Sequence, residues 1–271
     1  MKFEDFTTPE YRLGSEYMKH PIFKKLEFYS DFYNSLSFSI MGFSSSGTYS
    51  IVNIDTYVFS SMQGTIESIQ DVLKKGRIND AYALLRKYYD STIINIYSNL
   101  YLSDNFNIEN LIVTQIDNWV KGIDKLPEYR IMSQYIKDSE KLRSINNLLE
   151  KDDRYKKIRN RCNDNTHYNF YRNLLLNDND IHNPNRVKYL NTFSYDIENI
   201  LIQHLGYLFY LNDYYMVSSD YMDYIEVGLQ PEEDSQYWVA HFIQEVFDKV
   251  IIPKRADIAM TIKENTMMQL G

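Results

Sequence analysis

The chain has 271 residues, of which 44% are hydrophobic and 24% are charged, an ordinary composition for a globular protein. Its formal net charge of −8 excludes a surface that is basic all over. Broad nonspecific binding of duplex nucleic acid is therefore excluded, because phosphate contacts need lysine and arginine. The lone cysteine, Cys162, excludes an internal disulfide and favours a reducing compartment.

No stretch of the sequence resembles a secretion signal or a membrane span. Residues 1–20 lack the apolar core of a signal peptide. The most apolar window, 197–211, is interrupted by Gln203 and His204, and it is shorter than the roughly 20 apolar residues that a spanning helix needs. We therefore expect a cytoplasmic protein that makes no contact with a membrane.

Apolar residues at steps of three and four predict helices along most of the chain. The segment 42–50 is predicted as a loop, and it matches neither a phosphate-binding loop nor a nucleophile elbow. The predicted helices span 21–33, 51–75, 79–102, 108–123, 128–136, 139–150, 187–215, 231–252 and 254–270. Glycines and prolines are few, which argues against many tight turns, and the predicted fold class is all-α.

The second and third of these helices form a predicted antiparallel pair, because their connection is short. Gly76 is the left-handed residue that ends the first of them, and Asn79 or Asp80 can cap the second. Arg86 and Asp90 stand four residues apart in the second helix. This spacing indicates either an ion pair along the helix or the rim of a polar site on a neighbouring helix.

The stretch from Lys151 to Leu174 differs from the packing helices around it. Between Lys151 and Arg161 there are six basic and two acidic residues, a formal charge of +4, so the rest of the chain carries −12. A local positive island on an acidic protein suits a ligand that carries phosphate. The alternative is a basic helix face that is only solvated.

The helical period divides this stretch into an apolar and a polar side. The predicted buried side consists of Tyr155, Ile158, Cys162 and Thr166. The predicted polar side consists of Asn160, Asn163, Asp164 and His167. Cys162 is thus a small core residue and not a nucleophile. Arg161 lies about 120° from His167 around an ideal helix, so either the helix is distorted or two chains complete each site.

The segment from Arg161 to His167, within the string RNRCNDNTHYN, resembles the R-x(4–6)-H motif of the HEPN superfamily. The resemblance implies a helical bundle over 51–215 that forms a homodimer, with the motif near the dimer cleft. Residues 1–50 are then an N-terminal extension, and 216–271 are C-terminal helices packed on the same domain.

Many HEPN proteins are metal-independent endoribonucleases of toxin, CRISPR and anti-phage systems, so the resemblance implies RNA as substrate, no cofactor, and an antitoxin or defence-system partner. By this analogy His167 acts as general base or acid, and Arg161 stabilises charge on the scissile phosphate, which yields a 2′,3′-cyclic phosphate. The predicted substrate-binding residues are Lys157, Arg159, Asn160 and Asp164. A polar residue usually follows the arginine of the motif, but Cys162 follows Arg161, whereas seven residues separate Arg159 from His167. Which arginine is functional stays open.

The other histidines have plainer interpretations. His182 lies in a polar loop, which we interpret as solvated because its acids lack metal-ligand spacing. His204 on an apolar face is predicted to be a hydrogen-bonded core residue. Pro231 is predicted to begin a helix, on which His241 and Glu245 are interpreted as a surface pair since no third metal ligand accompanies them.

Two other functions compete with the ribonuclease hypothesis. One is a non-catalytic helical module that binds RNA, a nucleotide or a protein through the same basic patch. The other is a structural or assembly protein whose basic helix is only solvated.

Overall fold

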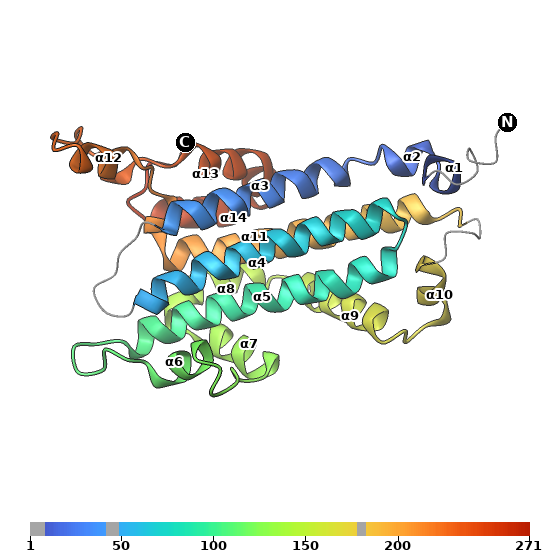
Figure 1. Cartoon of the computed structure of the whole chain (residues 1–271), viewed down its shortest axis with the longest axis horizontal. Helices are drawn as coiled ribbons and strands as arrows, with labels where there is room; N and C mark the ends of the chain where they lie inside the picture. The colour runs from blue at the N-terminus through green and yellow to red at the C-terminus, as the bar shows by residue number, and fades with distance from the viewer. Residues whose placement is uncertain (1–8, 42–48, 178–182) are drawn as a thin grey trace. The chain divides into compact units, whose positions relative to one another are not determined.

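Helices make up almost all of the regular structure in the computed structural model, which describes residues 9–41, 49–177 and 183–271 (Figure 1). In these residues the β pairing is limited to two isolated bridges, Asn107 with Asn110 and Val217 with Val239. The predicted all-α class is confirmed. No helix among the described residues has the length and apolarity that crossing a membrane requires.

The longest helices are α3, α4, α5 and α11, and shorter ones follow or precede them. The α-helices are α1 (Pro9–Leu13), α2 (Ser15–Met18), α3 (Ile22–Met41), α4 (Tyr49–Lys74), α5 (Ile78–Asn105), α6 (Thr114–Val120), α7 (Tyr129–Asp138), α8 (Arg143–Leu149), α9 (Arg154–Thr166), α10 (Tyr171–Leu174), α11 (Arg186–Leu211), α12 (Asp220–Glu226), α13 (His241–Val246) and α14 (Ile252–Asn265). Short helical turns are η2 (Glu140–Leu142), η3 (Leu175–Asn177), η4 (Asp213–Met216), η5 (Ser235–Tyr237) and the π-helical η6 (Phe247–Ile251).

The described chain divides into two compact units, each assembled from three separate segments. Unit 1 consists of Met1–Tyr33, Ser60–Ser91 and Asp153–Ile200. Unit 2 consists of Asn34–Phe59, Thr92–Asp152 and Leu201–Gly271. The long helices α3, α4, α5 and α11 each contribute one part to each unit.

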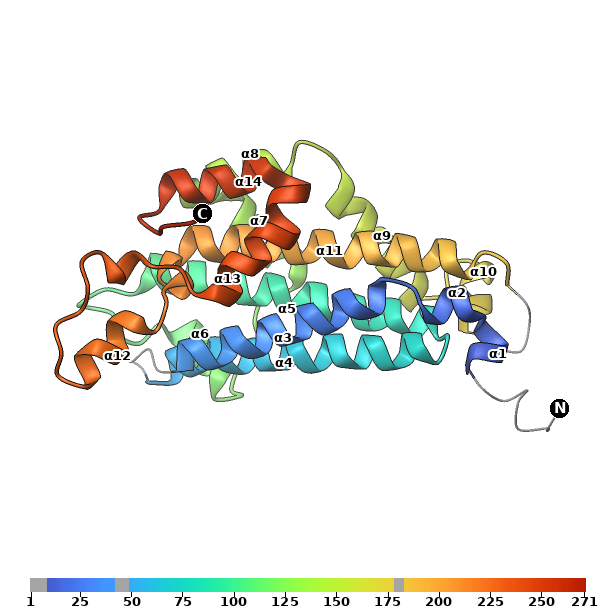
Figure 2. The same cartoon turned by 90° about the horizontal axis from the view of Figure 1, so that it is seen from above.

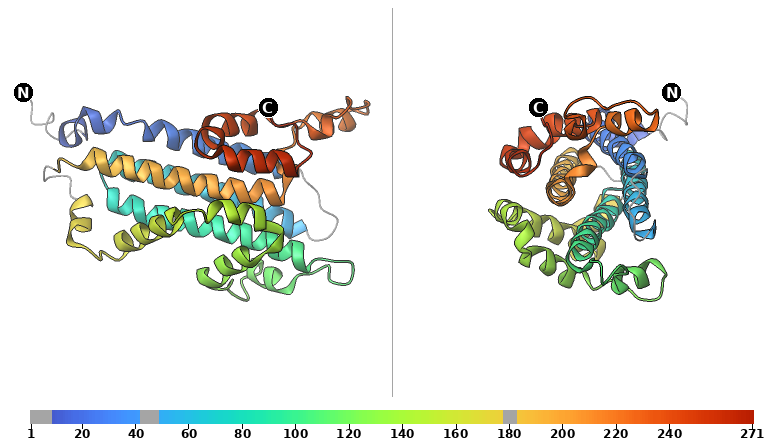
Figure 3. Two further views of the ribbon diagram at one scale, coloured as in Figure 1. Left: turned by 180° about the vertical axis from the view of Figure 1, so that it is seen from behind. Right: turned by 90° about the vertical axis from the view of Figure 1, so that its left-hand side faces the viewer.

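Unit 1 packs the first parts of α3, α5 and α11 with the last part of α4, and α9 lies alongside α5 (Figures 1 and 3). Its core is formed by the apolar stripes that the helical period predicts. Fully buried members are Leu26, Ile66, Ile69, Leu73, Leu85, Ile158, Leu190, Phe193 and Ile197. Buried tyrosines can pair their hydroxyl groups within the core, as in the 2.8 Å hydrogen bond between Tyr33 and Tyr88.

The start of α5 is stabilised by a residue far along the chain. Gly76 adopts the predicted left-handed backbone (φ 75°), but α5 already begins at Ile78, so the prediction that Asn79 or Asp80 caps it is wrong. Instead, the Asn177 Oδ1 accepts hydrogen bonds from the backbone N–H groups of Asn79 (3.0 Å) and Asp80 (3.1 Å). These N–H groups at a helix start have no partner within the helix, and a side-chain oxygen satisfies them.

Unit 2 packs the remaining parts of the long helices with α6, α7, α8, α12, α13 and α14. Helices α8 and α14 are in contact (Figure 2), and Arg255 Nη2 donates to the Leu148 carbonyl at 2.8 Å. His204 is buried and hydrogen-bonded to Asn95 Oδ1 at 2.9 Å, which confirms the predicted core histidine.

Two predicted helices of unit 2 begin later than the sequence indicates. The predicted helix 108–123 is helical only from Thr114. Ile108, Leu111 and Ile112 are exposed, so a helix here would not bury their apolar side chains against a neighbour. The helix predicted from Pro231 begins at His241. Directly before it, residues 238–240 are extended, since Val239 forms a bridge to Val217 and the Ser218 N–H donates to the Trp238 carbonyl at 2.8 Å.

Candidate functional site: a basic cavity in unit 1

Helix α9 carries the central part of the Lys151–Leu174 stretch, and three of its four predicted buried positions are correct. Tyr155, Ile158 and Cys162 are buried, but Thr166 is exposed and Asn165 is buried in its place. Asn165 can be buried because Asn79 Nδ2 donates to its side-chain oxygen (2.9 Å) and its carbonyl (3.1 Å). A satisfied amide therefore replaces the expected threonine in the core.

The thiol of Cys162 is inaccessible, which confirms it as a core residue. Its side chain is fully buried, and burial raises the pKa of the thiol to about 12. At neutral pH the group is a neutral thiol, which is neither nucleophilic nor a metal ligand.

Most cations of the basic run are engaged with neighbouring side chains. Arg159 pairs with Asp90 and lies over the Tyr89 ring, with Cζ 5.6 Å from the centroid. Asp90 also accepts from Arg86 Nε at 3.1 Å, which confirms the predicted ion pair along α5. Neither Arg86 nor Asp90 lines the cavity described below. Lys157 pairs with Asp153 at 2.9 Å on the exposed side. The run is therefore not a continuous free basic face.

Arg161 extends from α9 to α11, where it forms a two-bond pair with Asp196. Arg161 Nε donates to Asp196 Oδ2 at 2.8 Å, and Nη2 donates to Oδ1. Tyr82 of α5 donates its hydroxyl to the same Oδ2 at 3.2 Å. Burial raises the pKa of the Asp196 carboxyl, and the Arg161 guanidinium and the Tyr82 hydroxyl offset part of that rise. The hydrogen bonds to Asp196 raise the pKa of Arg161, so the guanidinium stays charged.

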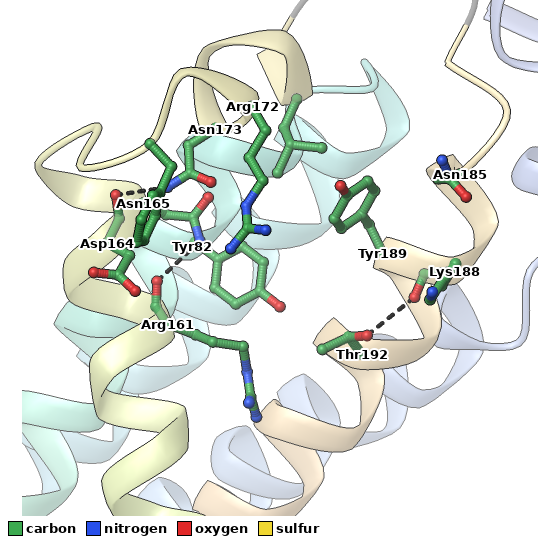
Figure 4. A pocket seen from close by; sticks show the side chains of 12 residues that line it. Tyr82, Arg161, Asp164, Asn165, Arg172, Asn173, Asn185, Lys188, Tyr189 and Thr192 are labelled. Carbon is green, nitrogen blue, oxygen red and sulfur yellow. Dashed lines mark hydrogen bonds between the residues drawn. The ribbon is translucent and has the colours of Figure 1, made fainter.

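A cavity of about 350 Å³ opens beside this pair (Figure 4). Its walls come from α5, α9, α10, η3 and α11, all within unit 1. The lining residues are Tyr82, Arg161, Asp164, Asn165, Phe170, Arg172, Asn173, Leu176, Asn185, Lys188, Tyr189 and Thr192. Figure 4 shows Arg161 and Arg172 reaching the cavity from the α9–α10 side, and Lys188, Tyr189 and Thr192 from α11.

Arg172 and Lys188 give the cavity its positive charge. Neither side chain has an ion-pair partner in the described part of the chain, and Asp164 is the one acid among the lining residues. The Arg172 guanidinium lies over the Phe170 ring, 4.9 Å from its centroid. The cavity therefore places these two cations beside the rings of Phe170 and Tyr189, a combination that suits an anionic ligand with a planar ring.

Asparagine side chains hold the wall that carries Arg172. Asn173 Nδ2 donates to the Asp164 carbonyl at 2.7 Å, and Asn169 Nδ2 donates to Asp164 Oδ1 at 2.9 Å. Between Asp164 and Asn169, Tyr168 adopts a left-handed backbone (φ 49°), which reverses the chain after α9. These bonds fix α10 against the end of α9 and so shape the cavity.

The structure does not bring His167 to the cavity. His167 follows α9 as an exposed residue, and it is not among the lining residues. Helix α9 has regular dihedral angles up to Thr166, so no kink turns His167 toward Arg161. Of the other predicted site residues, Arg161 and Asp164 line the cavity, while Asn160 is exposed outside it.

Several cavity residues were missed by sequence reasoning. Arg172 lies in the stretch that we singled out, but its role depends on the fold of α10. Lys188, Tyr189 and Thr192 lie at the polar start of a helix whose apolar stripe indicates packing. Only the spacings of four and three residues that separate Lys188 and Tyr189 from Thr192 could have indicated a shared face.

The described residues contain no group of three or more His, Cys, Asp or Glu side chains that could hold a metal ion. Glu245 pairs with Lys249 on α13 and the following turn. The predicted solvated loop around His182 lies outside the described residues.

Comparisons with protein-family models, with curated proteins and with solved structures find no match to this chain.

Proposed function

We propose that this chain binds a nucleotide-containing ligand, RNA above all, through the basic cavity of unit 1. The observation that carries the proposal is the placement of Arg172 and Lys188, two cations without an ion-pair partner among the described residues, in one aromatic-lined cavity. Phosphate recognition needs such cations, and stacking needs exposed ring faces.

The size and charge of the cavity agree with this ligand class. A volume of about 350 Å³ lies in the range of small-molecule sites, so one nucleotide unit fits better than a duplex. Arg161 is balanced by Asp196, and Asp164 opposes one of the two remaining cations. The excess of positive charge is local, which explains how an acidic protein can attract a polyanion at one point.

The binding test uses a short fluorescein-labelled single-stranded oligouridylate and measures fluorescence anisotropy at several salt concentrations. Lys188→Ala should weaken binding by about tenfold, since a charged hydrogen bond contributes about 1.5–3 kcal/mol. Lys156→Ala is the matched control, because it removes an exposed lysine of α9 that does not line the cavity. Equal affinities of Lys188→Ala and the wild type would exclude the cavity as the binding site.

A second candidate function is metal-independent cleavage of RNA, as the HEPN resemblance implies. The observation that favours it is the imidazole of His167, which is exposed and makes no hydrogen bond or ion pair with the described residues. It is thus available for proton transfer at the end of the helix that carries Arg161. Since one chain does not bring the two together, this function requires a homodimer in which a second chain completes the site. An antitoxin or defence-system partner belongs to the same proposal.

The cleavage test incubates the oligouridylate with the protein in EDTA. Activity should produce 2′,3′-cyclic phosphate ends and should disappear in His167→Ala, while binding persists. Light scattering of the wild type should report a dimer. Undiminished cleavage by His167→Ala, or a monomer that cleaves, would contradict the two-chain site.

A further inference from the structure

Arg161 is bonded along one edge of its guanidinium group only. The group has five N–H donors arranged as a planar fork. Asp196 takes the edge formed by Nε and Nη2, with one hydrogen from each nitrogen. The other edge, formed by Nη1 and the second hydrogen of Nη2, has no acceptor in the described residues. The Arg161 side chain is 34% exposed and lines the cavity, so a ligand can reach this edge.

Asp196 holds the Arg161 guanidinium in that orientation. Its side chain is fully buried, and both carboxylate oxygens are occupied: Oδ1 by Arg161, and Oδ2 by Arg161 and the Tyr82 hydroxyl. Tyr82 is itself fixed, because its ring packs edge-on against Phe193 at 4.9 Å between centroids. A guanidinium held by two bonds to a buried carboxylate has little freedom to rotate.

We propose that Asp196 is a positioning residue, which presents the free edge of Arg161 to two oxygens of the ligand's phosphate. The inference rests on the proposed binding function and assigns different roles to the three cations. Arg172 and Lys188 attract the phosphate by charge, whereas Arg161, whose charge Asp196 balances, recognises it by geometry.

Charge and geometry predict opposite results for Asp196→Asn, which makes this variant the decisive test. The substitution removes one negative charge next to the cavity. If charge alone decided affinity, the oligouridylate would bind more tightly and with a steeper salt dependence. If Asp196 positions Arg161, the affinity falls by about tenfold, because the bidentate contact is lost while the cation stays.

A matched control separates these effects from a general change in charge or stability. Glu198→Gln removes a buried acid from the same helix, and Glu198 pairs with Lys25 outside the cavity. This variant should bind like the wild type. Circular dichroism and thermal melting of both variants show whether they are folded at the assay temperature.

A paired variant keeps the test decisive if Asp196→Asn is not folded. Arg161→Gln with Asp196→Asn leaves no unpaired charge and an unchanged net charge. Its affinity should fall by about tenfold while the slope of log K against log salt stays that of the wild type, whereas Lys188→Ala should lower that slope by about 0.7.

The outcomes separate the two proposals. Tighter binding by Asp196→Asn, or wild-type affinity in the paired variant, would overturn the positioning role but leave the cavity as the binding site if Lys188→Ala still weakens binding. If the wild type does not bind the oligouridylate, both proposals fall.

Discussion

Among the described residues each unit buries one aspartate almost completely, and the two carboxylates are stabilised in different ways. Asp196 of unit 1 is bonded to a cation, Arg161, at the edge of a cavity. Asp55 of unit 2 accepts, within the part of the chain that the structure describes, only from uncharged groups: Nδ2 of Asn95 (2.7 Å), Nδ2 of Asn99 (3.0 Å) and the Tyr215 hydroxyl. A buried carboxylate without a cation retains most of its desolvation penalty.

The pKa values of unit 2 reflect this penalty. Burial raises the pKa of Asp55 to about 6, although its three hydrogen bonds each lower it. Nearby, burial lowers the pKa of His204 to about 3, so this histidine is neutral over the physiological range. The network of unit 2 is closed and serves the core, whereas the ion pair of unit 1 leaves one guanidinium edge accessible. A buried acid therefore indicates a candidate site only where the side chain that it binds reaches open space, as Arg161 does in the cavity.

The largest expected effect is a loss of stability when Arg161, the cation that pairs with Asp196, is removed. Arg161→Ala leaves Asp196 buried without its charge partner, so the free energy of unfolding should fall by about 3–5 kcal/mol. Urea denaturation measures the loss. Adding Asp196→Asn to this variant should recover much of it, because no buried charge then remains. A loss that the second substitution does not reduce would show that the pair is not the source of the stability.

The second prediction concerns the pH dependence that Asp55 confers on unit 2. Its folded-state pKa is raised above the ordinary value of 3.8, so the native state holds the proton more tightly than the unfolded state does. The stability from Asp55 is complete below pH about 4 and is lost as the pH rises through about 6, a change of about 3 kcal/mol at 1.36 kcal/mol per pKa unit.

The difference in unfolding free energy between the wild type and Asp55→Asn isolates this contribution. It should decline from pH 4 to pH 6 and be constant above, with the variant gaining relative to the wild type. His204 acts in the opposite direction, since its pKa is lowered, but it is present in both proteins and cancels. Parallel stability curves would mean that the pKa of Asp55 in the folded unit is not raised above its value in the unfolded chain.

The smallest expected effect is on the uncharged cap of α5. It shows whether the stability of unit 1 also depends on hydrogen bonds between uncharged groups, as that of Asp55 in unit 2 does. Asn177→Ala removes the side-chain cap of α5, and the free energy of unfolding should fall by about 1 kcal/mol. Asn160→Ala, at an exposed position of α9, is the matched control and should stay within about 0.5 kcal/mol of the wild type. Equal stabilities of the two variants would contradict the capping role.

The sequence by itself determined the all-α class and the inward faces of the long helices, because the helical period places residues such as Ile66, Leu85 and Ile197 on one side whatever packs against them. The same logic placed Cys162 and His204 in the core. It failed at 108–112, where apolar residues at suitable spacing remain exposed, since spacing does not guarantee a surface to pack against.

Only the tertiary structure decided what the polar residues do. Arg161 was selected for a motif that pairs it with His167, yet its contacts are with Asp196, 35 residues along the chain, and with a cavity shared by Arg172 and Lys188. The cap of α5 likewise comes from Asn177, 98 residues from Asn79. Burial follows a local period, but a hydrogen bond or ion pair depends on two groups meeting in space, and no local pattern specifies which distant residue will be there.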